Sequence, residues 1–458
     1  MSQLDDLLRE LGAAANADGR VAIQGRDPVF ACRYPLGELA AALQAALGLA
    51  ASELWQLRGG RPQDVSVPVR HAAASLVSFL WLRAPGREPL RETSATTALY
   101  PCGDGRWIHL HGGLPHLRDG TLRVLGCADS REAVAAAVAR WNAEELEDAL
   151  AAERLCGAMV RSDAEWSAHA QGRALGEAPL VEILPLGAGP AAALPAAPRP
   201  LTGIRALDLT RILAGPTCGR TLAEHGADVL RIGCPRLPDI DPFVIDTGHG
   251  KRAANLDLDR PADAEALLRL VDGADVFVNG YRPGTLARRG FGPEALAARR
   301  PGLVYVSIDC YGHEGPWRER PGWEQLAQTV TGLAHDHGGA DAQKLLPAAA
   351  CDYLTGGLAA WGALAALARR AREGGSWHVR VSLARTGMWI RRRRFAEGNG
   401  LSPVAGFRPD EIAAWSETTA TPYGRVTHLA PALRMSETAP RWDLPTVPLG
   451  THPPRWSP

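Results

Sequence analysis

The stretch that decides the fold is residues 204–232, IRALDLTRILAGPTCGRTLAEHGADVLRI. It opens with the apolar run Ile204–Leu209, which has the length of a buried strand. Thr217–His225 then predicts a helix, and Asp228–Ile232 predicts a second strand. A strand, a helix and a strand in so short a segment predict a βαβ unit with two parallel strands.

The same alternation continues along the chain. We expect helices at Arg260–Val271 and Gly292–Arg299 and strands at Asp275–Asn279 and Leu303–Asp309. Apolar strands that alternate with helices are typical of a doubly wound parallel sheet. The sequence therefore predicts an α/β fold with a Rossmann-like doubly wound parallel sheet. A further helix is expected at Glu324–Leu333.

The upstream half has a different character. An Ala- and Leu-rich helix is expected at Gly37–Arg58, followed by strands at Val65–Val69 and Arg106–Leu110. Helices are then expected at Ser130–Arg140 and Ala143–Ala152. Strands and helices that do not alternate regularly predict a smaller α+β domain.

A segment rich in Pro, Ala and Gly, residues 185–202, separates the two halves. It has no periodic apolar face and is predicted to be a semi-rigid linker. We therefore divide the chain into residues 1–184, the linker, a Rossmann-like unit at 203–383, and a partial small domain or tail at 384–458.

An internal repeat connects the halves. The heptapeptide ACRYPLG at residues 31–37 resembles ACDYLTG at 350–356, and an Ala-rich helix is expected after each. We interpret this as a tandem duplication. Arg33 stands where the second copy has Asp352, and because a guanidinium stays protonated it is no nucleophile. The first copy is predicted to be chemically inactive, with Arg33 either binding an anion or lying in solvent.

Composition excludes several classes of protein. The 458 residues hold 50 basic and 50 acidic side chains, and only Lys251 and Lys344 are lysines. A balanced charge argues against a nucleic-acid or membrane partner. The eight cysteines are dispersed and form no Cys-x-x-Cys pair. Two pairs of histidines are expected on strand faces, His109 with His111 and His335 with His337, but neither pair has an evident third metal ligand. We expect no metal site and a cytoplasmic protein.

Seven ordered blocks of the second half carry a family resemblance. They are Leu207–Arg211, Ala214–Pro216, His225–Val229, Lys251–Arg252 before Leu256–Leu258, Tyr281–Gly284, Val304–Ser307 and Cys351–Gly356. These blocks resemble the class III CoA-transferases, the CaiB/BaiF family that includes carnitine CoA-transferase, formyl-CoA transferase and α-methylacyl-CoA racemase. Residues 1–184 resemble the later portion of the same family, a helix plus the small α+β domain, so the chain is similar to a partial tandem fusion.

The resemblance implies a function. CoA would move from an acyl-CoA donor to a small carboxylic acid acceptor through an aspartyl-CoA thioester on Asp352, with Glu324 orienting the substrate or Asp352. It implies no tightly bound cofactor, because CoA is a substrate, and it implies a homodimer or a fused mimic of one. The CoA contacts that it implies are Arg211, Ile212, Leu213, Ala214, Leu256, Tyr281 and Arg288.

Physical chemistry supports Asp352 as the nucleophile. It is expected immediately before a helix, whose positive end favours an ionised carboxylate and offers free N–H donors to an oxyanion. On sequence alone an ordinary helix N-cap is the favoured interpretation of Asp352, and the resemblance reverses that preference; Glu324 is open to interpretation as an ordinary acidic residue in the first turn of its own helix.

Two alternative functions stay open. Asp259 and Cys234 replace basic residues of the family, which favours a catalytically inactive CoA-binding scaffold. An acyl-CoA racemase-like enzyme is the other alternative. Racemases of the superfamily have a His where this chain has Trp323, so inversion lacks its second proton-transfer group.

Overall fold

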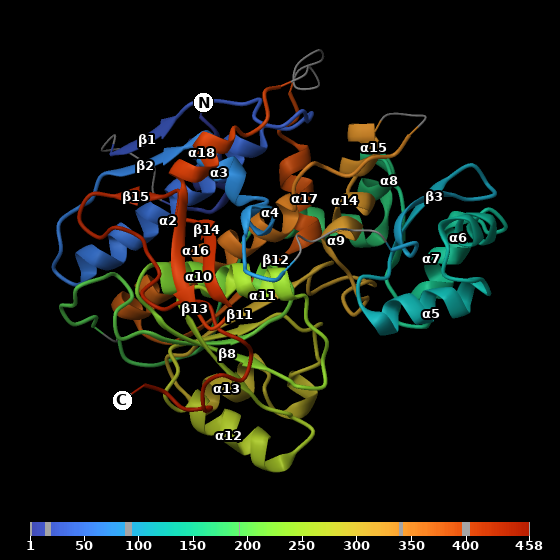
Figure 1. Ribbon diagram of the computed structural model, residues 1–458. Helices are drawn as coiled ribbons and strands as arrows, with labels where there is room; N and C mark the ends of the chain where they lie inside the picture. Colours follow the sequence, from blue (N-terminus) through green and yellow to red (C-terminus); the bar gives the residue numbers. More distant parts are fainter. Residues whose placement is uncertain are drawn as a thin grey trace.

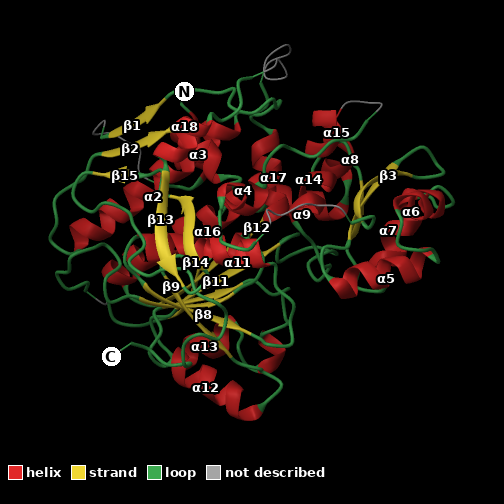
Figure 2. Ribbon diagram, in the orientation of Figure 1, coloured by secondary structure: helices red, strands yellow, loops and turns green. Residues whose placement is uncertain are grey.

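A seven-stranded sheet organises the second half of the chain (Figures 1 and 2). The computed structural model describes residues 2–13, 20–87, 94–191, 193–338, 342–395 and 404–457. Six strands are parallel: β7 (Arg205–Leu209), β8 (Asp228–Gly233), β9 (Lys251–Asn255), β10 (Val276–Asn279), β11 (Val304–Asp309) and β12 (Ser376–Ser382). The strand order is β6-β12-β11-β10-β7-β8-β9, which confirms the predicted doubly wound sheet.

Helices cover both faces of this sheet. In Figure 1 α12 and α13 lie below the sheet, and α10 and α16 lie above it. The helices of this half are α10 (Ala214–Glu224), α11 (Asp241–Thr247), α12 (Pro261–Val271), the 3-10 turn η1 (Ala287–Arg289), α13 (Pro293–Arg299), α14 (Glu324–Val330), α15 (Leu333–Gly338) and α16 (Ala350–Glu373). Helix α16 packs closely on α10 at Gly356, where an added Cβ would lie 2.4 Å from the Ala214 carbonyl oxygen. Glycine is therefore required at this crossing.

The first part of the chain packs on the same helical layer. The long, almost wholly buried helix α2 lies along α16. The elements here are α1 (Gln3–Glu10), β1 (Val21–Gln24), α2 (Leu36–Leu57), β2 (Val65–Pro68), α3 (Val69–Ser75) and α4 (Ser78–Trp81). A short strand from the C-terminal region, β15 (Arg434–Met435), completes the sheet of β1 and β2.

A smaller α+β unit follows, seen at the right of Figure 1. It contains an antiparallel sheet of β3 (Thr97–Pro101), β4 (Trp107–His111) and β5 (Gly157–Met159) with α5 (Pro115–Leu125), α6 (Arg131–Val138) and α7 (Ala143–Ala152). Helices α8 (Asp163–Ala168) and α9 (Ala170–Glu177) then return the chain to the large sheet through β6 (Glu182–Gly187).

The C-terminal region wraps back over both halves. It contains α17 (Leu383–Arg391), α18 (Pro409–Ala414) and the hairpin of β13 (Ser416–Thr421) and β14 (Gly424–Leu429). The tail then lies on the large sheet: His452 N donates to Ala253 O at 2.8 Å, and Trp456 Nε1 donates to Leu270 O at 2.9 Å.

Four local predictions were wrong. The first residues of the expected linker belong to β6, an antiparallel edge strand that tolerates Pro185; Ala192 of that segment lies outside the described residues. The helix expected to reach Leu333 ends at Val330, because Gly332 adopts a left-handed φ of 88°. His335 and His337 lie on helix α15 rather than on a strand. Asp352 lies in the first turn of α16, not before it.

Candidate active site

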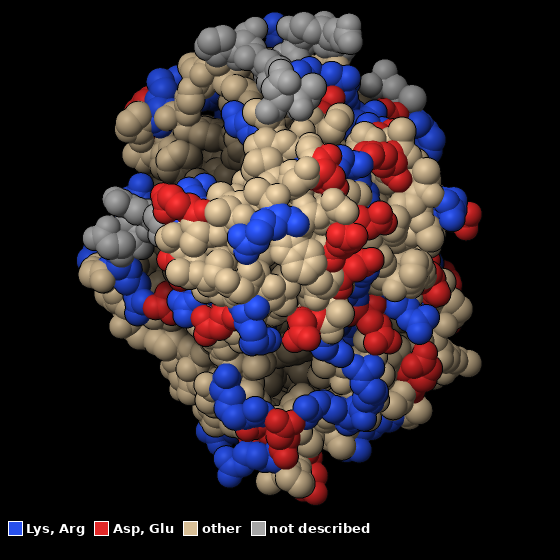
Figure 3. All heavy atoms as spheres, turned by 90° about the vertical axis from the view of Figure 1, so that its right-hand side faces the viewer, with Lys and Arg blue, Asp and Glu red and all other residues tan. Residues whose placement is uncertain are grey.

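A cleft opens at the carboxyl ends of β7, β10 and β11. Strands β7 and β10 are neighbours, but the chain leaves them towards opposite sides of the sheet, and ligands of doubly wound sheets bind at such a switch point. The cleft has a volume of about 270 Å³ and is lined by four arginines, Arg154, Arg211, Arg282 and Arg320; we call it the basic cleft. Figure 3 shows the right-hand side of the molecule in Figure 1, and basic side chains gather there around a hollow in the lower part of the view. The cleft therefore favours an anionic ligand.

Two of these arginines have unused hydrogen-bonding capacity. Arg211 Nε is buried without a partner among the described residues. Arg282 Nη1 is buried and has no hydrogen-bond partner among the described residues. Arg320 is already paired with Asp148 at 2.7 Å, and Arg211 donates to the Pro238 carbonyl. Because a buried donor without a partner is costly, Arg282 and Arg211 are the cations of the cleft best prepared to receive a phosphate or carboxylate oxygen.

Two buried carboxyl groups, Asp352 and Glu324, lie at the inner end of the basic cleft. Glu324 Oε2 accepts the backbone N–H of Asp352 at 2.5 Å, and Glu324 Oε1 accepts that of Cys351 at 3.2 Å. No side chain caps α16 from its own N-cap residue, Ala349. Glu324, the first residue of α14, thus caps α16 from another helix.

This cap changes one sequence expectation. The start of this helix was expected to offer free N–H donors to an oxyanion, but Glu324 accepts the N–H groups of Cys351 and Asp352. Gln328 completes the arrangement by donating to Glu324 Oε1 at 2.5 Å. The first turn of α16 is therefore fixed by side chains of α14.

Burial raises the pKa of Asp352 well above its usual range, and the nearby Glu324 charge raises it further, while a hydrogen bond from the Ala214 amide acts in the opposite direction. Burial also raises the pKa of Glu324, against hydrogen bonds from Gln328, Cys351 and Asp352. Like charges in a dry site resist joint ionisation. The pair consequently holds a proton at higher pH than isolated carboxyl groups would.

The loop that faces Asp352 runs from Arg211 to Ala214, between β7 and α10. Ile212 has a φ of 67°, in the left-handed region that β-branched residues rarely adopt. Such strain persists only where the surroundings impose it, and it concentrates at functional sites. The loop lines the cleft with four successive residues and directs the Ala214 amide to Asp352.

A buried ion pair supports this loop. Lys251 Nζ donates to Asp208 Oδ2 at 2.7 Å and to the Pro216 carbonyl at 2.6 Å, and Thr210 donates to the other Asp208 oxygen. Asp208 and Lys251 are 0% and 2% exposed. The pair joins β7, β9 and the first turn of α10, so it fixes both ends of the Arg211–Ala214 loop.

A second cavity meets the basic cleft at Asp352. It has a volume of about 620 Å³, and we call it the apolar cavity because large apolar side chains dominate its wall. Both cavities share Leu114, Ile212, Leu213, Trp323, Glu324 and Asp352. Trp323 packs against His111 of the small unit with ring centroids 4.2 Å apart. Asp352 is therefore accessible from two differently lined chambers.

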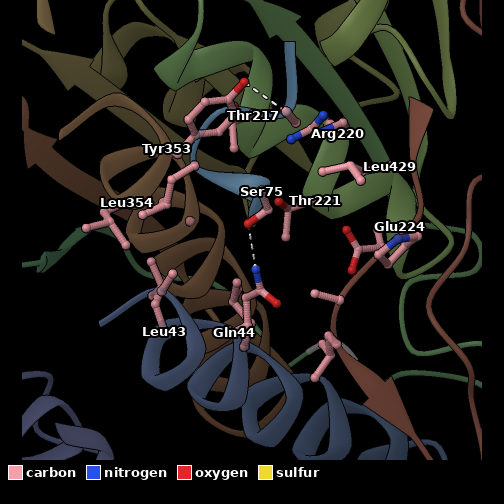
Figure 4. A pocket seen from close by; sticks show the side chains of 18 of the residues that line it. Leu43, Gln44, Ser75, Thr217, Arg220, Thr221, Glu224, Tyr353, Leu354 and Leu429 are labelled. Carbon is pink, nitrogen blue, oxygen red and sulfur yellow. Dashed lines mark hydrogen bonds between the residues drawn. The ribbon is translucent and has the colours of Figure 1, made fainter. Parts of the chain in front are cut away.

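A polar network next to Asp352 connects the two halves of the chain. Tyr353 donates to Asp246 Oδ2 at 3.1 Å, and Ser78 Oγ lies 2.7 Å from the same oxygen. Arg220 of α10 binds Asp246 at 3.0 Å. Figure 4 shows Tyr353 and Arg220 on the wall of a small cavity of about 80 Å³, where α10, α16 and α2 meet. The network fixes the residue next to Asp352.

The sequence-predicted site residues separate into two groups. Arg211, Ile212, Leu213, Ala214, Tyr281, Glu324 and Asp352 line the basic cleft. Leu256 is 4% exposed in the apolar core on the opposite face of the sheet from α10, among residues such as Leu267. Arg288 is exposed beside Gly284 and is not part of the cleft lining. Asp259, which replaces a family Lys, pairs with Arg289 at 2.6 Å.

Sequence reasoning did not assign Arg154, Arg282 and Arg320, or the Asp208–Lys251 pair, to the site. Arg154 and Arg320 carry no local mark that separates them from other arginines of the chain, whereas Arg282 lies within the family block Tyr281–Gly284. Lys251 did carry a signal, because it is one of only two lysines.

Within the described ranges, no group of three or more His, Cys, Asp or Glu side chains is arranged to hold a metal ion. His109 and His111 do share a strand, β4, with ring centroids 6.0 Å apart. Among the helices described, none has the length and apolar character to span a bilayer.

The fold is an α/β fold with a cleft at the carboxyl edge of a doubly wound sheet. The chain belongs to CoA-transferase family III, whose family model matches residues 12–181 and 201–426. It is an acyl-CoA transferase of that family.

Two relatives cover most of the chain. "Acetyl-coenzyme A transferase nodX" of Hypoxylon pulicicidum is 32% identical over 443 residues, 85% of this chain and 74% of that protein. An "Acyl-CoA transferase" of Gibberella moniliformis is 34% identical over 75% of this chain and 68% of that protein. A solved CaiB/BaiF family protein from Brucella suis is 28% identical, covering 50% of this chain and 65% of that one, with a TM-score of 0.40.

Proposed function

We propose that this enzyme moves CoA from an acyl-CoA to a small carboxylic acid through an aspartyl-CoA thioester on Asp352. The observation that carries the proposal is the position of the Asp352 carboxyl group where the basic cleft and the apolar cavity meet. The phosphates of CoA suit the arginines of the basic cleft, and the acyl group then lies towards the other cavity.

The chemistry balances in four steps. An Asp352 oxygen attacks the thioester carbon, the C–S bond breaks, and CoA thiolate leaves a mixed anhydride. The thiolate attacks the Asp352 carbonyl carbon, the anhydride C–O bond breaks, and the donor acid departs. The acceptor carboxylate then attacks the aspartyl thioester and releases the thiolate, which attacks the acceptor acyl carbon and regenerates Asp352. Covalent catalysis of this kind divides one difficult exchange into easier steps.

The other site residues have supporting roles in this proposal. Glu324 positions Asp352 through two backbone hydrogen bonds, and the Ala214 amide is directed to the carboxyl group that reacts. Arg211, Ile212, Leu213 and Tyr281 bind CoA along the cleft wall. Leu256 and Arg288 are further from this lining, so we assign Leu256 to the support of the CoA-binding loops and Arg288 to the outer rim.

Trapping tests the proposal directly. The protein is incubated with an acyl-CoA, quenched with hydroxylamine, and digested for peptide mass spectrometry. We expect the label on Asp352, and none in Asp352→Asn. Asp336→Asn is the control, because Asp336 is a half-buried carboxylate bonded to Tyr34, beside Arg33. Labelling of Asp352→Asn at any other residue, or of no residue in the wild type, contradicts the proposal.

We also propose that residues 1–184 and the C-terminal hairpin are remnants of duplicated units. Tyr34, one residue after Arg33, donates to Asp336 at 2.7 Å, just as Tyr353, one residue after Asp352, donates to Asp246. Arg394 pairs with Asp336 as Arg220 pairs with Asp246. The hairpin β13–β14 corresponds to β3–β4. One label per chain is expected, and a second label in the first half refutes the expectation that the first copy is inactive. A homodimer of such fused chains is measurable by sedimentation.

A further inference from the structure

The apolar cavity has a wall that selects its occupant. Phe79 and Leu80 of α4 face Ile240 and Phe243 across it, and the two phenylalanine rings make an edge contact with centroids 5.0 Å apart. Its volume of about 620 Å³ falls within the range of small-molecule sites. A chamber of this size next to Asp352 accommodates far more than a methyl or formyl group.

The cation in the described lining of the cavity is already paired. Arg118 is the cation of its described lining, and it binds Asp119 at 2.8 Å and lies 3.9 Å from Asp129. Burial lowers the pKa of His111 well below its usual range, so the ring is neutral. A second carboxylate on the substrate would find no unpaired cation in this described wall, and burying an unpaired charge is costly. The four arginines of the basic cleft make the opposite environment.

We propose that the enzyme transfers CoA between monocarboxylic acids with apolar chains, whose tails fill the apolar cavity, and discriminates against dicarboxylic acids. This inference rests on the proposed function, since it assigns the substrate class of the Asp352 site. Trp323 and Leu114 line both chambers and separate the polar CoA arm from the acyl tail.

An identity exchange tests the proposal without knowledge of the natural acceptor. Octanoyl-CoA is incubated with carbon-13 octanoate, and succinyl-CoA with carbon-13 succinate, and labelled acyl-CoA is followed by mass spectrometry. We expect kcat/KM for the octanoyl exchange to exceed that for the succinyl exchange by at least about tenfold, a modest discrimination for an apolar pocket. A wild-type preference for succinyl exchange overturns the substrate class but leaves the proposed function standing.

A charge placed in the wall provides the matched test. Leu80 lines the cavity and is 40% exposed, and Leu444 is 43% exposed and lies outside its lining, so arginine is compatible with folding at either position. We expect Leu80→Arg to lower octanoyl exchange at least about tenfold and to raise succinyl exchange, while Leu444→Arg changes neither. Equal effects of both variants, or none of Leu80→Arg, overturn the assignment of the cavity. If neither donor labels Asp352, the proposed function itself fails, and this inference fails with it.

Discussion

Removal of the Lys251 charge should destabilise the enzyme far more than removal of a surface charge. In Lys251→Met the Asp208 carboxylate stays at 0% exposure and keeps Thr210 as a partner, but it loses the ammonium group 2.7 Å away. The Pro216 carbonyl at the start of α10 loses its donor as well. A buried carboxylate that loses its countercharge costs about 3–5 kcal/mol.

That cost predicts a measurable shift in melting temperature. With about 2–4 °C per kcal/mol for a unit of this size, Lys251→Met should melt roughly 6–20 °C below the wild type. The Arg211–Ala214 loop should also lose support, so Asp352 labelling by acyl-CoA should slow at temperatures where the variant is still folded. Differential scanning fluorimetry and the trapping assay measure the two effects.

Two further variants make this prediction specific. Arg299 pairs with Asp272 at 2.6 Å on the surface, both side chains being at least 40% exposed, so Arg299→Met should leave the melting temperature almost unchanged. Asp208→Asn combined with Lys251→Met removes the stranded charge and should recover a large part of the lost stability. A melting temperature of Lys251→Met equal to that of Arg299→Met, or no recovery in the double variant, refutes the reasoning.

Two other predictions concern the first two turns of α16. Glu324→Gln removes the neighbouring charge that raises the pKa of Asp352. In the proposed reaction Asp352 attacks when it is ionised, which is above its pKa, so the acidic limb of the pH profile of the labelling rate should move to lower pH. An acidic limb at the same or a higher pH contradicts this effect of Glu324 on Asp352. Gly356→Ala places a Cβ 2.4 Å from the Ala214 backbone oxygen and should lower the free energy of unfolding by about 1–3 kcal/mol. Gly357→Ala meets the flexible end of Leu43 at 2.7 Å and should lower it less. Equal denaturation midpoints of the two variants would show that the α10–α16 crossing is not tight.

Four of the six parallel strands were predictable because each is a short apolar run bounded by turn residues. Strands β7, β8, β10 and β11 begin and end within a residue of the sequence prediction. Strand β6 was missed because its partner β12 lies far along the chain, and its EILPLG sequence contains Pro and Gly, which are depleted in strands. The local order of apolar and polar residues indicates which segments are buried, but it does not indicate which distant segment adds an edge strand to the sheet.

The candidate site shows the same division. Asp352 and the loop from Arg211 to Ala214 were identified from residue types and family blocks, and they line one cleft. The role of Glu324 as the cap of a different helix was not predictable, since it depends on how α14 meets α16. Leu256 was placed in the site because it ends a matching block, yet an apolar residue after a strand serves the core equally well.

The acidic pair gives a physical reason for the unusual support around it. Two buried carboxyl groups with raised pKa values destabilise the folded state at any pH where both are ionised. Pairs of this kind are therefore typical of functional sites. Here Glu324 replaces the missing N-cap of α16, and the same contact brings its charge beside Asp352. The strained Ile212 loop opposite and the buried Lys251–Asp208 pair below it are costly features at the same place. Costs that converge on one carboxylate, while nearby helices satisfy ordinary packing rules, indicate that this corner of the fold is arranged for chemistry rather than for stability.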